Sequence, residues 1–281
     1  MTMLDTPPPL AVPRLSADDA GQLKVTQTRV VRSEWLKMRT LRSSWLTFGL
    51  AVLSVPGIGI AIAWSTANDW THMRPRQQNR FDPLGDPLSG FNLSQLAIGV
   101  LGILLISGEY SGGMIRATLA AVPKRLPVLW AKLAVFTTIT LVFMVPTAIF
   151  TFFASEKLLS VRHIQTSWST PNVPRIVIGI GLYLAVIAVL AIGIGAITRN
   201  VATAIGAFVA ILLVLPVIAS ALPQIWADRI NKWLPSEAGQ ALLGISSDTA
   251  TLSPWRGFAV FCGYAALSVV IAAMLLKRRD A

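Results

Sequence analysis

The chain has 281 residues, of which 54% are hydrophobic and only 13% are charged, against about 25% charged in an ordinary soluble domain. This composition excludes a typical soluble enzyme and predicts an integral membrane protein. The formal net charge of +11 could indicate a nucleic-acid-binding protein. However, the lysines and arginines flank apolar runs instead of gathering on one face, so membrane topology explains them better and no nucleic-acid partner is expected.

The N-terminal part of the chain is polar and basic. Residues 1–25 carry four prolines and few apolar side chains, which predicts a disordered cytoplasmic tail, with no cleavable leader expected. Residues 26–45 are predicted to form an amphipathic interfacial helix with a basic polar face. A plain solvated helix with a chance apolar stripe is the alternative. The residues expected to anchor this helix at the membrane surface are Trp35, Arg39, Arg42 and Trp45.

Six apolar runs follow, each long enough to cross hydrocarbon about 30 Å thick. Their expected bounds are residues 46–64, 88–107, 128–153, 176–197, 201–222 and 257–276. The fold class is therefore an all-α integral membrane protein whose six-helix domain occupies residues 46–276. Between the fifth and sixth spans, residues 223–255 contain tryptophans at helical spacing, which predicts an outer re-entrant or amphipathic helix. Residues 277–281 are expected to form a basic cytoplasmic tail.

The distribution of basic residues sets the expected orientation. An even number of spans places both termini on one side, and that side carries 15 lysines and arginines against 9 on the other. Because basic residues are retained in the cytoplasm, both termini and the loop between spans two and three are predicted to be cytoplasmic. The chain is thus expected to be a multi-pass protein of the plasma membrane.

Several kinds of chemistry are missing from the sequence. It contains no GxxxxGK[ST] phosphate loop, so it is not expected to bind ATP in that way. Two isolated histidines and one cysteine, Cys262, give no credible metal site and no internal disulfide. No charged residue stands in the middle of a predicted span, although ion-coupled carriers usually keep such residues there. Any transport therefore takes its energy from elsewhere.

The stretch with chemistry of its own is GEYSGGMIRATLAAVPKR, residues 108–125, between spans two and three. Glu109 closes the preceding apolar run, two glycines follow, and residues 115–122 could form two helical turns before Pro123. We predict a short helix offered to a soluble partner. In another interpretation, which is compatible with the first, Glu109 only caps that helix, a contribution of about 0.3–1 kcal/mol.

This pattern resembles the permeases of type-2 ATP-binding-cassette (ABC) exporters, the membrane subunits that work with separate ATPase subunits. In that family an acidic residue, a glycine, a helical stretch, a proline and basic residues form the cytoplasmic coupling helix. Met114 departs from it, because the family often has threonine after the glycine. The segment SEWLKMRTLRSSW, residues 33–45, is similar to the family's interfacial helix. The residues expected to contact the ATPase are Glu109, Gly112, Gly113, Ile115, Arg116, Leu119, Pro123, Lys124 and Arg125.

The resemblance implies a permease subunit that pairs with a second copy or a sister chain and with two ABC ATP-binding subunits. ATP and magnesium would be bound by those partners, so this chain is expected to bind no cofactor and not to be an enzyme itself. Two other functions stay open from the residues alone. One is a non-transporting membrane scaffold or sensor that anchors a cytoplasmic partner, and the other is an ATP-independent carrier or channel.

Overall fold

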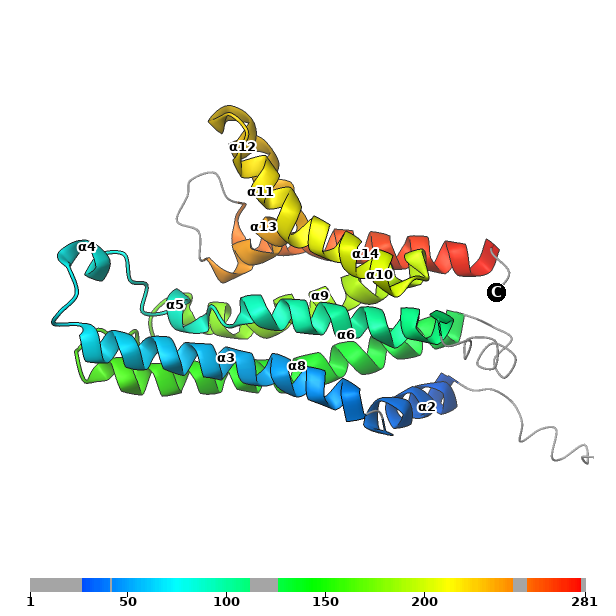
Figure 1. Cartoon of the computed structure of the whole chain (residues 1–281), viewed down its shortest axis with the longest axis horizontal. Coiled ribbons are helices and arrows are strands. Elements are labelled where there is room, and N and C mark those ends of the chain that lie inside the picture. Colours follow the sequence, from blue (N-terminus) through cyan, green and yellow to red (C-terminus); the bar gives the residue numbers. More distant parts are fainter. Residues whose placement is uncertain (1–26, 41, 112–125, 245–251, 279–281) are drawn as a thin grey trace, which may run out of the picture.

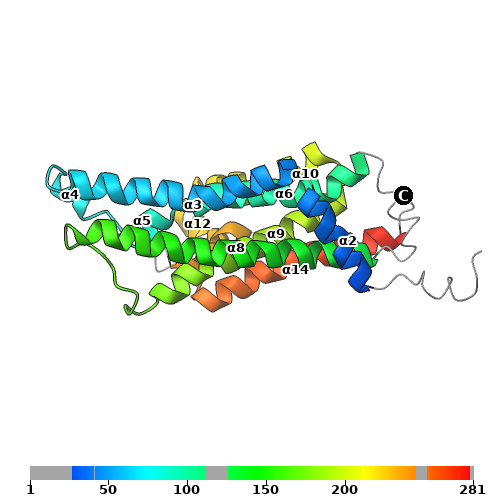
Figure 2. The same cartoon turned by 90° about the horizontal axis from the view of Figure 1, so that it is seen from below.

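The computed structural model describes residues 27–40, 42–111, 126–244 and 252–278, and these residues form helices and connections without a strand. Six helical segments are long and apolar enough to cross a membrane, which confirms the predicted all-α membrane fold with six spans. They are Ser44–Asp69, Gly85–Glu109, Leu126–Ser160, Val173–Thr198, Val201–Ser220 and Pro254–Arg278. The long helices run side by side along one axis (Figures 1 and 2).

The N-terminal half contains two helices ahead of the first loop and three after it. They are α2 (Gln27–Thr40), α3 (Arg42–Asp69), α4 (Pro75–Gln78), α5 (Gly85–Leu88) and α6 (Phe91–Ser111). Of the single helix expected over residues 26–45, the structure describes α2 as far as Thr40, and Trp45 lies in the span helix α3. Span two is interrupted. A side chain at Gly90 would come within 2.5 Å of the Ser54 carbonyl oxygen, and this close contact lies at the turn between α5 and α6.

The C-terminal half contains the remaining spans and the outer connection. Its helices are α8 (Leu126–Ser160), α9 (Val173–Thr198), α10 (Val201–Val209), α11 (Leu215–Ser220), α12 (Gln224–Ile230), α13 (Pro235–Gln240) and α14 (Pro254–Arg278). A π-helical turn at Ala210–Val214 joins α10 to α11 within span five, next to Pro216. Helix α12 lies in the segment where an outer helix was expected, and its Trp226 is 59% exposed. Its position in a membrane interface stays a prediction.

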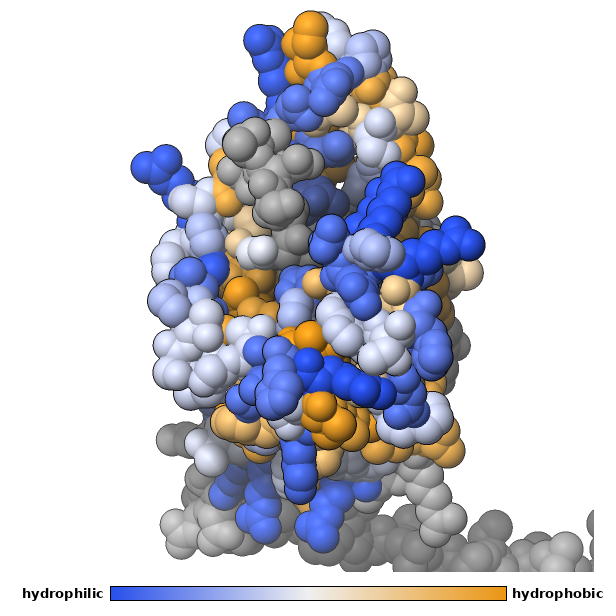
Figure 3. All heavy atoms as spheres, turned by 90° about the vertical axis from the view of Figure 1, so that its left-hand side faces the viewer, coloured by the Kyte–Doolittle hydropathy of each residue, from blue (hydrophilic) through white to orange (hydrophobic). Residues whose placement is uncertain are grey.

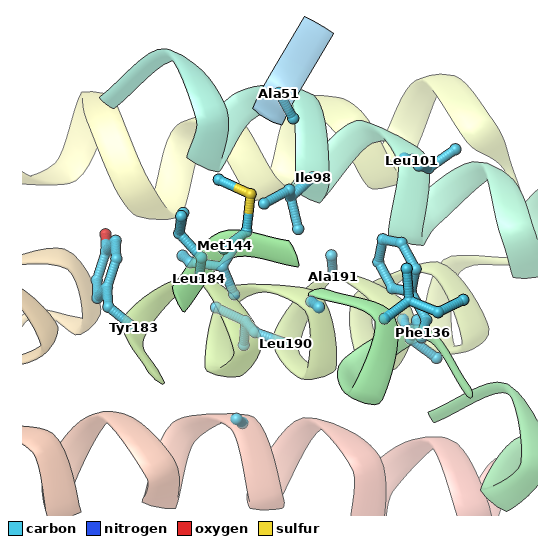
Figure 4. Packing of buried hydrophobic residues seen from close by; sticks show 14 of the residues in the cluster. Ala51, Ile98, Leu101, Phe136, Met144, Tyr183, Leu184, Leu190 and Ala191 are labelled. Atoms are coloured by element: carbon cyan, nitrogen blue, oxygen red, sulfur yellow. The ribbon is translucent and has the colours of Figure 1, made fainter. Parts of the chain in front are cut away.

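Helix α9 is the centre of the bundle. It packs against α6, α8 and α14, and 72% of its most apolar 18-residue stretch is buried inside the protein. Its charged residue, Arg175, lies in the first turn, and its small residues allow the neighbouring backbones to approach. Figure 4 shows Ile98 of α6, Met144 of α8 and Leu184 of α9 meeting in the core. The fully buried Tyr183 hydroxyl is paired, since it donates to Gln95 Oε1 at 2.6 Å.

The contact between α9 and α14 depends on Gly193. A Cβ at this position would lie 2.8 Å from Ser268 Cβ and 3.1 Å from the Ser268 carbonyl carbon. We expect Gly193→Leu to lower the free energy of unfolding in detergent by about 1–3 kcal/mol, because the two helices must separate. Gly263→Leu on α14 is the matched control, since nothing lies within 4 Å of a Cβ there. Equal stability of the two variants would contradict this packing.

The two ends of the bundle carry different elements. Helix α2, the end of α6, the beginning of α8 and the end of α14 lie at one end, whereas α4, α5 and α12 extend toward the other (Figure 1). The end that carries α4 is largely hydrophilic (Figure 3). The end of α6 and the beginning of α8, which flank the central segment (residues 112–125), therefore lie beside α2.

Candidate functional site

Four charged side chains meet where α2, α6 and α8 come together, and we call them the ion cluster: Glu34, Lys37, Glu109 and Lys132. Lys132 Nζ lies 2.7 Å from Glu34 Oε2 and 2.8 Å from Glu109 Oε1. Lys37 Nζ lies 2.8 Å from Glu34 Oε1 and 3.1 Å from Glu109 Oε1. Each ammonium group therefore donates to both carboxylates, and the ring of four carries no net charge.

The ion cluster is mostly withdrawn from solvent. Glu34, Glu109 and Lys132 are each at most 6% exposed, whereas the Lys37 side chain is 39% exposed. Burying a single charge is costly, so these groups are stable here because each has partners of opposite charge. Among the described residues, Glu109 Oε2 is buried and accepts no hydrogen bond. One acceptor of the cluster is therefore left without a donor in the part of the chain that the structure describes.

The charges of the two α2 residues are reinforced by the cluster. Burial alone would raise the pKa of the Glu34 carboxyl, but the ammonium groups of Lys132 and Lys37 outweigh burial and lower this pKa. Burial alone would lower the pKa of Lys37, but its hydrogen bond to Glu34 and the charge of Glu109 raise it. Both groups therefore remain ionised throughout the neutral range.

The position of each cluster residue in its helix accounts for its place in the cluster. Glu109 lies in the last turn of α6, where a carboxylate is disfavoured by the negative end of the helix dipole and so benefits from nearby cations. Lys132 lies about two turns into α8, on the face that packs against α2. Glu34 and Lys37 are three residues apart and so lie on the same face of α2.

The structure describes only some of the site residues that were predicted from the sequence. Glu109 is placed in α6, within the ion cluster. The other expected contact residues all fall outside the described residues, and their role stays a prediction: Gly112, Gly113, Ile115, Arg116, Leu119, Pro123, Lys124 and Arg125. Of the expected surface anchors, Trp35 is 43% exposed and Arg39 is exposed. Trp45 packs edge-on against Phe143, and the side chain of Arg42 is not described.

Sequence reasoning missed Glu34, Lys37 and Lys132 as functional candidates. Lys132 falls within the expected third span, residues 128–153, where it is 5% exposed and pairs with two carboxylates. The available signal was a single glutamate, Glu34, in an otherwise basic amphipathic helix. A buried lysine in a span requires an acidic partner, and such a partner could have been sought in that helix.

Comparison with known proteins agrees with this architecture. No curated protein matches the chain. A family model described as ABC-2 family transporter protein matches residues 30–221, which begin in α2 and include spans one to five. This match covers more than half of the chain and includes every member of the ion cluster. The chain is a multi-pass membrane protein of the permease type and belongs to the ABC-2 family of transporter proteins.

Proposed function

We propose that the chain is the membrane subunit of an ATP-driven exporter in the plasma membrane, and that it works with two separate ATP-binding subunits. ATP and magnesium would be bound and used by those subunits, since the sequence here has no phosphate-binding loop. Family membership supports a permease that associates with such a subunit. The termini and the central segment face the cytoplasm in this proposal, as the excess of basic residues on that side favours.

The ion cluster is the observation that carries the proposed coupling. Helix α6 ends at Ser111 and α8 begins at Leu126, so these two helices hold the two ends of the central segment. Glu109 and Lys132 join those helices at 2.8 Å, and Glu34 ties α2 to the same lysine. A displacement of the central segment by an ATP-binding subunit would therefore move three helices as one unit.

Span five supports a dimer of membrane subunits. Only 17% of the most apolar 18-residue stretch of span five is buried within the chain, whereas 72% of the corresponding stretch of α9 is buried. Val217 and Ile218 of α11 are 68% and 57% exposed. We assign this face to a second copy or a sister chain, with the substrate path between the two subunits. Disulfide formation by Val217→Cys in a Cys262→Ser background would identify the face, whereas purely monomeric protein would contradict the assignment.

The experiment that tests the whole proposal is capture of the ATP-binding subunit. The tagged chain, purified from its own membranes, is expected to bring with it a protein that contains GxxxxGK[ST] and hydrolyses ATP. Deleting residues 112–122 should abolish this capture, because it removes the proposed contact. Deleting residues 74–80, the segment that contains α4 at the opposite end, is the control and should leave capture intact.

Two results would favour the other functions. Capture of a partner without any ATP-dependent change in the chain would support a scaffold or sensor. Substrate movement by the purified chain in liposomes without an ATPase would support an independent carrier or channel. Either result would contradict the exporter assignment, whereas loss of capture on deletion of residues 112–122 supports it.

A further inference from the structure

A groove with a volume of about 420 Å³ lies between α2 and the first half of α8, outside the ion cluster. Its volume is within the range of ligand pockets, about 300–1,000 Å³. It opens on the outer surface of the bundle, because several of its lining residues are exposed. The residues that define it are Val31, Arg32 and Trp35 of α2 and Ala134, Val135 and Ile139 of α8.

The groove extends inward from the membrane surface. A Cβ at Gly102 would lie 3.1 Å from both Phe136 of α8 and Ala191 of α9, so these residues share one level of the bundle. Ala191 precedes the end of α9 at Thr198 by seven residues, or about 10 Å of helix. The deep wall of the groove, next to Phe136, therefore lies about 10 Å inside the end of the most buried span.

The outer part of the groove lies nearer the membrane surface. Val30 of α2 packs against Val128 and Ala131, close to the beginning of α8. Arg32 is two residues further along α2 and is exposed. Its side chain can reach the headgroup layer while its methylene groups cover apolar surface. Because Arg32 lies between Val30 and Glu34 on α2, the groove offers an apolar wall deeper in the bundle and a cation nearer its end.

The charge of α2 selects the kind of lipid. The exposed charged side chains described on this helix are Arg29, Arg32 and Arg39, all cationic. Glu34 is the one acidic residue of α2, and it points into the ion cluster and is neutralised there. Of the three arginines, Arg32 is the one that lines the groove. Anionic headgroups are attracted to such a surface by about 1 kcal/mol per basic residue.

We propose that this groove binds one anionic phospholipid of the surrounding bilayer, with an acyl chain against Val135 and Ile139 and the phosphate at Arg32. The lipid fills the space between α2 and α8 and holds α2 against the bundle. The proposal does not depend on an ATP-binding subunit. Lipid binding can therefore fail while capture of the ATP-binding subunit succeeds, and capture can fail while lipid binding succeeds.

The test is native mass spectrometry of the full chain in detergent, with dioleoylphosphatidylglycerol and dioleoylphosphatidylcholine as probes. The wild-type chain is expected to retain one phosphatidylglycerol in preference to phosphatidylcholine. Arg32→Gln should reduce that preference about fivefold, as expected for one basic residue near the surface. Arg76→Gln, an exposed arginine at the opposite end, is the matched control and should keep the preference.

A second variant tests the groove itself. Ala134→Phe fills the groove and should remove the tightly held lipid, whereas Ala259→Phe on the exposed face of α14 should not. A photoreactive residue at Thr138, which also lines the groove, should cross-link to phospholipid. Equal retention of the two lipids by the wild-type chain, or cross-linking of Thr138 to a second copy, would overturn the proposal.

Discussion

Replacing Lys132 with methionine is expected to lower the free energy of unfolding by about 3–5 kcal/mol, the usual cost of removing one partner from a buried ion pair. Lys132 donates to Glu34 at 2.7 Å and to Glu109 at 2.8 Å. Without it, two buried carboxylates face each other and share only the partly exposed Lys37. The measurement is the unfolding midpoint in mixed detergent micelles, followed by helical content.

Two variants show whether charge imbalance is the cause of that loss. Adding Glu109→Gln to Lys132→Met removes one of the two carboxylate charges that then share Lys37, so the double variant should recover part of the stability. Arg76→Met changes an exposed arginine and should stay within about 0.5 kcal/mol of the wild type. If Lys132→Met were as stable as Arg76→Met, the ion cluster would not support the α2–α6–α8 junction.

Glu109→Gln is expected to abolish most of the ATP-dependent movement of α2 while leaving the ATP-binding subunit attached. The substitution preserves the shape of the side chain and leaves Lys132 paired with Glu34, but it removes the ionic link to α6. The movement can be measured as the distance between spin labels at Arg39→Cys and Lys277→Cys in a Cys262→Ser background. Both labelled positions are exposed.

The matched control for this coupling variant is Glu156→Gln, which removes a carboxylate near the opposite end of α8. The control should retain the full ATP-dependent change in the distance between the labels. A full change in Glu109→Gln as well would show that the ion cluster does not transmit the movement. Comparison of Glu109→Gln with Glu156→Gln therefore distinguishes the loss of a local link between helices from a general effect of removing a negative charge.

The six spans could be predicted because a helix that crosses hydrocarbon must be long and apolar, and both properties are visible in the sequence. The residues at which the spans begin and end were harder to predict from the sequence. Helix α8 has 35 residues, or about 52 Å, so it extends well beyond the apolar core. The turn before α6 lies where Gly90 meets the backbone of Ser54, a tertiary contact that no local pattern reveals.

The ion cluster could not be predicted for the same physical reason. Glu34 and Lys132 are 98 residues apart, and Lys37 and Glu109 are 72 apart. Periodicity identifies which side of a helix is polar, but it does not identify the helix that lies against that side. Glu109 was singled out from the sequence as a notable carboxylate, whereas Glu34 and Lys37 were assigned to an interfacial helix and Lys132 to an apolar span.

The order of the cluster along the chain has a consequence for biosynthesis. A lysine within a membrane helix costs about 2.5–3.5 kcal/mol at the helix centre during insertion by the translocon. Synthesis proceeds from the N-terminus, so Glu34 and Glu109 emerge from the ribosome before Lys132 does. The third span thus enters the bilayer when both of its counterions already exist. Moving the lysine ahead of its acids would make a nascent helix insert the lysine before either counterion exists.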